Sequence, residues 1–278
     1  LFPLYISPQV EKYTGYTPEE LYRSPEVWLS AMHPEDGKNF YEVLRERIDQ
    51  KITKPVEFRV YHKNGSLHWA EEIGSTITMP DGTVLFQGIS RDVTARHNAR
   101  EKLIYYSNFE HLINEISLNL MNASSEDINQ VLQNTVEALG EYMQVDRAYI
   151  FDFNDSEQTM SNTFEWCNKC ITPQMDNLQN VPMTPYPWWI NKMVNNEEIT
   201  LDSLDELPAE SAPIKDLLAQ QDIISLLVVP MFNNGQASGF IGFDMVSNKT
   251  HWEAEAIHIL RLASAMIVST RERLQKPC

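Results

Sequence analysis

The sequence predicts an α+β protein of two domains, each an antiparallel sheet with flanking helices, joined by a long helix. The chain has 278 residues, more than one typical domain of about 100–150 residues. Short strand-like runs are separated by turn dipeptides such as Asn64-Gly65 and Asp81-Gly82, which is typical of antiparallel hairpins. The stretch 91–121 contains no Gly or Pro, so it can form one uninterrupted helix.

The first region opens with short helices and continues with strands. Thr17 can cap a helix, Pro18 suits its first position, and Glu20 can bond back to the backbone N–H of Thr17. Residues 55–61 then alternate between apolar and polar side chains, as in a half-buried strand. Two further strand-like runs follow the turns at 64–65 and 81–82, so the region predicts a three-strand meander after helices.

The long helix carries a seam of period 3.5. Its gaps alternate between four and three residues, which favours helix pairing. One interpretation is that the helix couples two domains or two chains; the other is that its second half is the first helix of the next domain. The seam residues are Ala95, Ala99, Lys102, Tyr106, Phe109, Ile113, Ile116 and Leu120.

The second region has strands enclosed by helices at both ends. Residues 148–153 are largely apolar on both faces, so this strand should be covered on both sides. Asn233-Asn234-Gly235 separates two further apolar strands and indicates a hairpin. Residues 128–143 and 254–275 have the pattern of helices.

Composition excludes several classes of partner. The net charge is −17, and the acidic excess lies after residue 100, so nucleic acid is not expected as a partner. No apolar run reaches the roughly 20 residues that cross a bilayer, so we expect no membrane contact within this stretch. Three Cys residues make no disulfide framework and favour a reducing, cytoplasmic compartment. Because the chain begins at Leu1 without Met, we expect a fragment of a longer protein.

The first region resembles a PAS domain with its C-terminal PAC-type motif. The resemblance covers residues 4–96 and rests on GYTPEEL, HPED, EFRVYHKNGSLHWAEE and GISRDVT. It implies a PAS-like domain at 1–96, with a five-stranded sheet that cups a ligand pocket and an N-terminal strand that is incomplete here. Candidate pocket residues are Trp28, Phe58, Trp69 and Phe86.

Asp92 and Thr94 match the family's Asp-x-Thr, where movement of the last strand passes to the following helix. The alternative is that they only cap that helix. The absence of Cys from residues 1–96 makes flavin adduct chemistry unexpected. His33, His62 and His68 are weak candidates for haem ligation.

The second region resembles a GAF domain, joined to the first by a connecting helix at 97–107. The resemblance covers residues 108–272 and rests on FEWCNKCITPQMDNLQNVP, ITLDSLDELP, SLLVVPMFNNGQASGFIGFD and the helix after Trp252. It implies a GAF-like domain at 108–278 with a six-stranded sheet, terminal helices on one face, a ligand pocket on the other and a C-terminal output helix. Candidate pocket residues are Phe151, Phe164, Trp166, Trp188 and Trp189.

The cofactor remains unassigned from the sequence. A bilin is not expected, because the Cys-His pair of bilin-binding members is missing. The Asn-Lys-Phe-Asp-Glu constellation of cyclic-nucleotide binders is not found either, which weakens the prediction of such a ligand. Cys167 and Cys170 form a CxxC that is interpreted as ordinary thiols, as a redox pair or as haem ligands. No further ligands stand at zinc spacing, so no metal site is expected.

The resemblances together imply a PAS–GAF sensory input module, as found in prokaryotic sensor histidine kinases of two-component systems. We expect it to be a homodimer through the connecting helix, to bind an unknown small ligand and to relay its presence through that helix. Alternatives are a haem-based redox or gas sensor and a ligand-free dimerisation scaffold. The sequence contains no Gly-rich phosphate-binding loop, no GxSxG and no HExxH motif, so no catalytic residues are expected.

Overall fold

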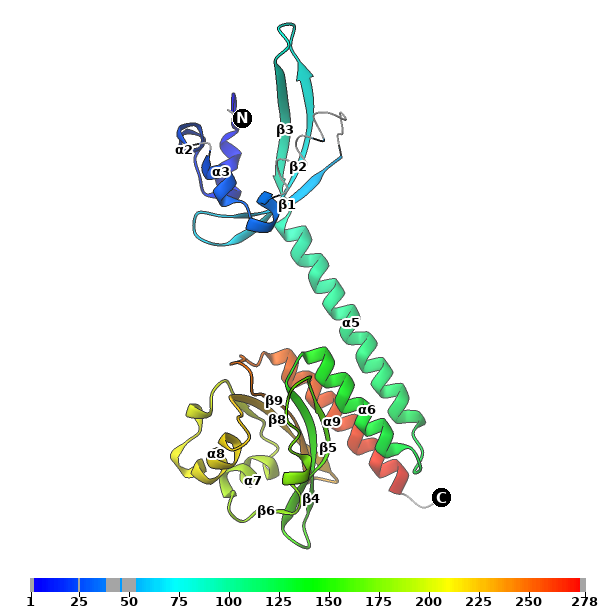
Figure 1. Cartoon of the computed structure of the whole chain (residues 1–278). Coiled ribbons are helices and arrows are strands. Elements are labelled where there is room, and N and C mark those ends of the chain that lie inside the picture. Colours follow the sequence, from blue (N-terminus) through cyan, green and yellow to red (C-terminus); the bar gives the residue numbers. More distant parts are fainter. Residues whose placement is uncertain (1–2, 25, 39–45, 47–53, 276–278) are drawn as a thin grey trace. The chain divides into compact units, whose positions relative to one another are not determined.

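The computed structural model describes residues 3–24, 26–38, 46 and 54–275. Contacts divide the chain into two compact units, Leu1–Ser107 and Asn108–Cys278, both drawn in Figure 1. No helix in these described ranges offers a stretch long and apolar enough to cross a lipid bilayer.

The first unit packs short helices against one antiparallel sheet. The predicted capping box is confirmed: Thr17 accepts from the backbone N–H of Glu20, and the Glu20 side chain accepts from that of Thr17. The sheet has the order β1-β2-β3. The elements are the 3-10 helix Pro8–Val10, α1 (Glu11–Thr14), α2 (Pro18–Arg23), α3 (Glu26–Ala31), β1 (Val56–Tyr61), β2 (Leu67–Thr78) and β3 (Val84–Asp92).

One face of this sheet holds the core of the unit. Phe58 and Val60 of β1 and Ala70 of β2 are buried against the helices, because alternate side chains of a strand point to the same face. The family resemblance implies five strands, whereas the described residues form three. Within those residues β3 pairs only with β2, so its other edge is free of strand partners.

Helix α5 (Thr94–Asn122) leaves the end of β3 and continues into the second unit. The two halves of the predicted seam differ. Ile116 and Leu120 are buried in the core of the second unit, and Phe109 and Ile113 pack against it. The second half of the seam is therefore the first helix of the next domain, as the second interpretation held. Tyr106 and the seam residues before it are exposed in this chain.

The second unit is built on a six-stranded antiparallel sheet, as predicted, with the order β6-β5-β4-β9-β8-β7. Its strands are β4 (Arg147–Asn154), β5 (Thr159–Cys167), β6 (Val181–Pro182), β7 (Ile199–Leu201), β8 (Ser225–Asn233) and β9 (Gln236–Met245). Its helices are α6 (Ile128–Met143), α7 (Pro187–Val194), α8 (Ala212–Ala219), α9 (Ala254–Gln275) and the 3-10 turns Met175–Asn177, Leu204–Glu206 and Ala209–Ser211.

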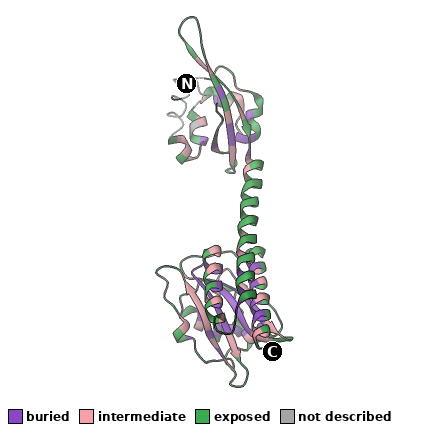
Figure 2. Ribbon diagram, turned by 90° about the vertical axis from the view of Figure 1, so that its right-hand side faces the viewer, coloured by how far each residue is buried: buried purple, intermediate pink, exposed green. Residues whose placement is uncertain are grey.

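The two faces of this sheet are covered by different layers. Helices α5, α6 and α9 pack on one face, while α7, α8 and the long loops lie over the other (Figure 1). Ala148 and Ile150 of β4 point into the first core, and Tyr149 and Phe151 into the second. The prediction that this strand is apolar on both sides is confirmed. The burial pattern in Figure 2 shows the sheet buried between the layers.

A close backbone approach at Gly239 joins the two central strands. Gly239 has φ +156°, and a methyl group there would overlap the carbonyl oxygen of Phe151. Since the obstacle is backbone, it cannot move aside as a side chain would. We expect Gly239→Ala to lower the free energy of unfolding by about 2–3 kcal/mol, measured by urea denaturation. The solvent-exposed turn residue Gly235 also has positive φ but meets no atom. Gly235→Ala should therefore cost less, and an equal loss would contradict the steric account.

Candidate functional site

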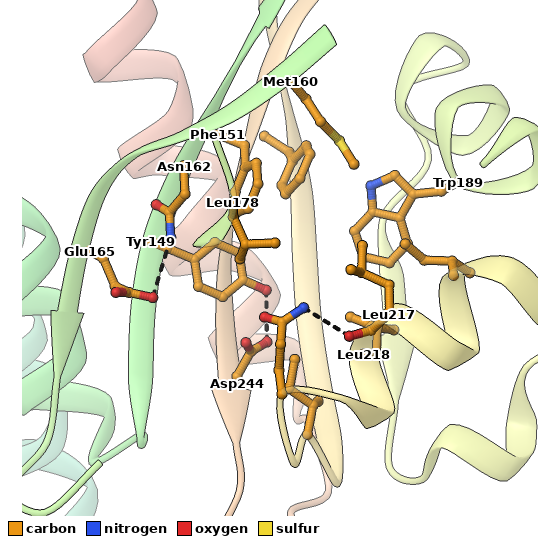
Figure 3. A pocket seen from close by; sticks show the side chains of 14 residues that line it. Tyr149, Phe151, Met160, Asn162, Glu165, Leu178, Trp189, Leu217, Leu218 and Asp244 are labelled. Atoms are coloured by element: carbon orange, nitrogen blue, oxygen red, sulfur yellow. Dashed lines mark hydrogen bonds between the residues drawn. The ribbon is translucent and has the colours of Figure 1, made fainter. Parts of the chain in front are cut away.

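A cavity lies in the second unit between the sheet and the layer of α7 and α8 (Figure 3). Strands β4, β5 and β9 supply its floor, and the helices and loops supply its roof. The residues that line it are Tyr149, Phe151, Met160, Asn162, Glu165, Leu178, Trp189, Ile214, Leu217, Leu218, Gln221, Ile223, Phe240 and Asp244.

The cavity is small in this conformation. The open space inside it is about 30 Å³, and one water molecule needs at least about 10–15 Å³ of such space. There is room for about two water molecules, so a ligand that fits without movement of the walls has only a few non-hydrogen atoms.

Four aromatic rings form much of the wall. Phe151 and Phe240 are direct partners on β4 and β9, and their rings stack with centroids 4.6 Å apart. The rings of Tyr149 and Trp189 stand at 88° and 72° to that of Phe240. Gly242 makes the position of Tyr149 possible, because a methyl there would lie 2.7 Å from the tyrosine ring.

A buried ion pair lies at one end of the cavity, where the carboxylate of Asp244 belongs to the lining. Asp244 and Arg147 are each 2% exposed, and Asp244 Oδ2 lies 3.8 Å from Arg147 Nη1. Tyr149 donates its hydroxyl to Asp244 Oδ1 at 2.7 Å, and Arg147 Nη2 donates to the Gln221 carbonyl at 2.8 Å. The pair is therefore held by Tyr149 of β4 and by the backbone of Gln221, which follows α8.

Burial governs the protonation of this group. It raises the pKa of Asp244 to about 7, against the lowering effects of Tyr149 and Arg147. Burial and the neighbouring Asp244 carboxylate raise the pKa of Tyr149 well above its usual value. Tyr149 therefore stays a hydrogen-bond donor, and Asp244 can change charge near neutral pH.

Two polar atoms at the cavity have no partner. Asn162 is 1% exposed, and its amide nitrogen donates to Glu165 Oε1 at 3.2 Å, which fixes the orientation of the amide. Asn162 Oδ1 and Trp189 Nε1 are buried without a hydrogen bond. Buried polar atoms in native proteins are normally paired, so these two atoms mark a place where a ligand or water completes the structure.

A bulge in β5 decides which side chains reach the cavity. Ile150 pairs with Phe164 but Phe151 pairs with Asn162, so Thr163 is an extra residue in the ladder. Asn162 and Glu165 therefore face the cavity, whereas Phe164 and Trp166 face the helices. The ring of Trp166 lies directly on Gly140 of α6.

The predicted pocket aromatics of the second unit are thus divided. Phe151 and Trp189 line the cavity, and Trp188 packs against the same core without lining it. Phe164 and Trp166 were expected at the pocket, and the structure places them on the opposite face, where they pair with Ile150 and Ala148 of β4.

The predicted pocket aromatics of the first unit do not converge on one point. Trp28 packs edge-on against the core residue Phe58, with centroids 6.4 Å apart. Trp69 lies on the opposite face of the sheet, stacked on His97 with centroids 4.0 Å apart. The ring of Phe86 lies against Gly74 on the neighbouring strand.

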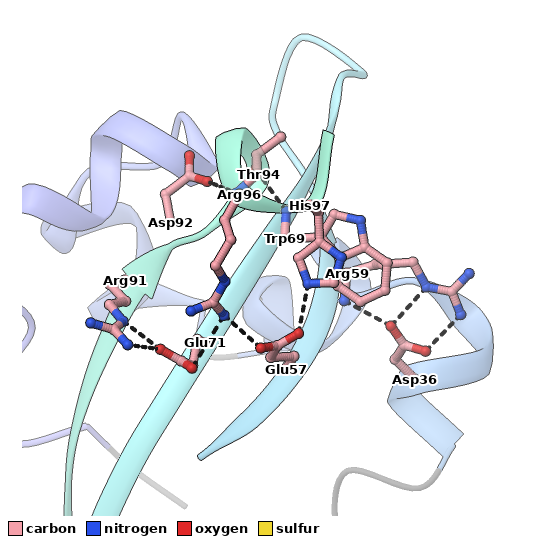
Figure 4. Close-up of polar contacts among 10 residues, drawn as sticks. All are labelled: Asp36, Glu57, Arg59, Trp69, Glu71, Arg91, Asp92, Thr94, Arg96 and His97. Carbon is pink, nitrogen blue, oxygen red and sulfur yellow. Dashed lines mark hydrogen bonds and ion pairs between the residues drawn. The ribbon is translucent and has the colours of Figure 1, made fainter. Parts of the chain in front are cut away.

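Asp92 and Thr94 tie the start of α5 to the sheet (Figure 4). Asp92 Oδ1 accepts from the backbone N–H of Thr94 at 2.8 Å, and Thr94 Oγ1 accepts from the backbone N–H of Trp69 at 2.8 Å. The other Asp92 oxygen lies 3.1 Å from His68 Nδ1. Asp92 therefore caps, as the second interpretation held, and Thr94 attaches the helix to β2. The relay of movement through this pair stays a prediction.

Ion pairs strengthen the same attachment. Glu57 of β1 pairs with Arg96 at 2.6 Å and with His97 at 2.6 Å. The buried Glu71 of β2 pairs with Arg96 at 3.3 Å and with Arg91 of β3. The ion pairs thus hold the first turn of α5 to β1 and β2, and β3 is joined to the same Glu71 carboxylate through Arg91.

The first thiol of the CxxC, Cys167, is held in its protonated form. Burial and the nearby Glu165 raise the pKa of the half-buried Cys167 to about 12, which suppresses the thiolate that redox and metal chemistry require. Cys170 is exposed. No group of three or more His, Cys, Asp or Glu suited to a metal ion occurs within the described ranges.

The histidines weighed for haem ligation have local partners. Backbone N–H groups of Glu35 and Asn64 donate to Nδ1 of His33 and His62. His68 lies between Asp92 and Ser66. Each imidazole therefore already takes part in a turn or a side-chain contact.

Two arginines of α9 connect this helix to the cavity strand and to the end of α5. Arg271 of α9 donates to both carboxylate oxygens of Asp152, at 2.5 and 3.1 Å, and Asp152 comes directly after the cavity residue Phe151 on β4. Arg273 donates to the carbonyls of Leu120 and Ala123 at 3.0 and 2.9 Å. It thereby satisfies carbonyls at the end of α5.

Sequence reasoning missed the polar residues of the site. Arg147, Asp244 and Tyr149 lie within apolar strands, and a charged residue inside such a strand was a usable signal. Asn162 and Glu165 gave no signal, because the bulge that orients them is not visible in the sequence.

Comparison with known families agrees with this fold. Residues 3–90 match the model of the PAS fold, and residues 127–270 match that of the GAF domain. The second match covers more than half of the chain.

Two curated proteins are similar to this chain over a small part of their own length. The methanogenesis regulatory histidine kinase FilI of Methanothrix harundinacea is 30% identical over 184 residues, which are 65% of this chain and 20% of the relative. An uncharacterized protein, y4lL, of Sinorhizobium fredii is 33% identical over 101 residues, which are 36% of this chain and 12% of the relative. The chain thus spans a fifth or less of the relatives that it matches.

Solved structures share the fold at low identity. The chromophore-binding domain of bacteriophytochrome RpBphP3 from R. palustris is 12% identical, with a TM-score of 0.52 over 97% of this chain and 88% of that one. The phycocyanobilin-bound GAF domain of a cyanobacterial phytochrome is 15% identical, with a TM-score of 0.51 over 60% of this chain and 97% of that one. The chain belongs to the GAF domain family and carries a PAS-fold domain before its GAF domain.

Proposed function

We propose that the chain is the sensory input module of a cytoplasmic two-component histidine kinase. In this proposal the GAF cavity binds a small ligand, and the terminal helices of the GAF domain pass its presence on. The similarity to FilI supports the kinase context. The described chain contains PAS and GAF domains and no catalytic domain, so the kinase activity belongs to the longer protein.

The observation that carries the proposal is the cavity with its unpaired polar atoms. A dimerisation scaffold without a ligand has no need of buried Asn162 Oδ1 and Trp189 Nε1 atoms that lack partners, since each such atom costs about 1–3 kcal/mol. A ligand that pairs with them would stabilise the state to which it binds.

The bilin pigments of the solved relatives do not fit this cavity. Its lining contains no Cys, and its open space of about 30 Å³ is far too small for a tetrapyrrole or a haem. A small colourless molecule suits the site better.

We propose further that helix α5 pairs with the same helix of a second copy. Leu103 and Tyr106 are 70% and 57% exposed, and residues 98–108 are exposed on every side of the helix. Pairing would cover these apolar side chains and would give the relay a rigid path.

The relay is tested by changing the phase of the helix. Deleting one residue within 97–107 turns the C-terminal part of the helix by about 100° relative to its start. We expect the deletion to change the basal autophosphorylation rate of the full-length protein, measured without added ligand, while the melting temperature of each domain is preserved. Deleting seven residues is the matched control, because it changes the phase by only about 20° and should leave the rate close to that of the unaltered protein. An unchanged rate after the one-residue deletion would contradict the relay.

A further inference from the structure

The charge of the cavity wall restricts the ligand. Glu165 and Asp244 are the charged residues among the fourteen that line it, and that set includes no Lys, Arg or His. Arg147 lies behind Asp244 and is not part of the lining. An anionic ligand would therefore face carboxylates without a cation to pair with it, whereas a cation would face opposite charge.

The aromatic walls suit the same kind of ligand. Phe240 and Phe151 form a stacked floor, and Tyr149 and Trp189 stand nearly perpendicular to it. Ring faces attract organic cations, most strongly where water is excluded. The rings also contact the apolar body that such a cation carries.

The unpaired oxygen adds a specific acceptor. Asn162 Oδ1 is buried and free, because the amide nitrogen of the same side chain is held by Glu165. An ammonium N–H can donate to it. Trp189 Nε1, the second unpaired atom, can donate to a water or to an oxygen of the ligand.

We infer that the GAF cavity binds a small organic ammonium ion, with its nitrogen toward Asn162 and the carboxylates and its apolar body against the rings. The inference rests on the proposed sensory function and names the ligand class of that site. With space for about two water molecules, the ligand has few non-hydrogen atoms.

Protonation of Asp244 is then linked to binding. Arg147 and Tyr149 of β4 and Glu165 and Cys167 of β5 are the titratable and charged groups around it. Since burial raises the pKa of Asp244 to about 7, a bound cation favours its charged form. Binding should therefore tighten as the pH rises from 6 to 8.

The test compares two probes that carry the same methyl group and fit the space of about two water molecules, methylammonium and methanol, by calorimetric titration of the whole chain. We expect the ammonium ion to bind at least tenfold more tightly. Asp244→Asn and Phe240→Leu should each weaken its binding at least fivefold, while Trp189→Phe, which keeps an aromatic ring, should weaken it less than Trp189→Leu. Glu157→Gln, at an exposed carboxylate, controls for attraction to the acidic surface.

Three outcomes would overturn the inference. Equal binding of both probes would show an apolar cavity without preference for charge. Ammonium binding that Phe240→Leu and Trp189→Leu leave unchanged would place it on the protein surface, and this holds even if Asp244→Asn fails to fold. Binding of neither probe would exclude the ligand class. The helix deletion tests the sensory function separately, because its result does not depend on the identity of the ligand.

Discussion

Arg147→Met is expected to lower the free energy of unfolding of the GAF domain by about 3–5 kcal/mol. Both members of the Arg147–Asp244 pair are 2% exposed, so removal of the arginine leaves a buried carboxylate without its counter-charge. The Gln221 carbonyl also loses the donor that reaches it at 2.8 Å. Urea denaturation of the chain at pH 8, where Asp244 carries most charge, measures the loss.

A double substitution distinguishes the cost of an unpaired buried charge from the cost of lost side-chain packing. Arg147→Met combined with Asp244→Leu removes both charges, and it should restore much of the stability that the single change loses. Arg100→Met, at an exposed position of α5, is the control for removing one positive charge. A loss below about 1 kcal/mol for Arg147→Met would mean that solvent reaches the pair.

The stability of the protein relative to Asp244→Asn should fall as the pH rises from 4 to 8. The folded pKa of Asp244 is raised from 3.8 to about 7. Between these values the folded state keeps a proton that the unfolded chain has lost, so stability declines with rising pH through this window and is level above it. At about 1.36 kcal/mol per pKa unit, the full difference is about 4 kcal/mol.

The Asn variant isolates this effect, because carboxylates such as Asp36 and Asp202 have lowered pKa values and contribute with the opposite sign in both proteins. Asp155→Asn, at an exposed carboxylate, serves as the second control. A difference between the two proteins that does not vary with pH would show that Asp244 stays ionised when buried.

Local signals in the sequence predicted most of the fold. The box of Thr17 and Glu20 requires only residues three apart, and the hairpin at Asn64-Gly65 requires a turn that Gly permits, here at φ +90°. Both depend on neighbours along the chain. The apolar faces of 148–153 likewise result from the alternation of a strand.

The cavity depends on features that no local pattern contains. Its walls come from β4, β5, β9, α7 and α8, which the sequence does not place against one another. The single extra residue at Thr163 puts Asn162 and Phe164 on opposite faces, because one added residue reverses the alternation of a strand. Phe151 and Trp189 were predicted from the sequence as pocket residues, whereas Asn162 and Glu165 could not be predicted.

The seam of α5 shows a similar limit. A period of 3.5 predicts an apolar stripe but does not say what covers it. Ile116 and Leu120 are covered by the GAF core of the same chain, whereas Tyr106 is exposed. The same sequence pattern therefore occurs both in the part of the helix that the GAF core buries and in the part that is exposed.

Hydrogen exchange of the chain with and without a bound probe tests the central claim most directly. The probe is whichever of methylammonium and methanol binds more tightly. The account predicts altered exchange at 116–123 and 264–273, which do not line the cavity but are connected to its strand through Arg271, Asp152 and Arg273. Protection confined to the lining segments, with the ends of α5 and α9 unchanged, would contradict the claim that the cavity signals through these helices.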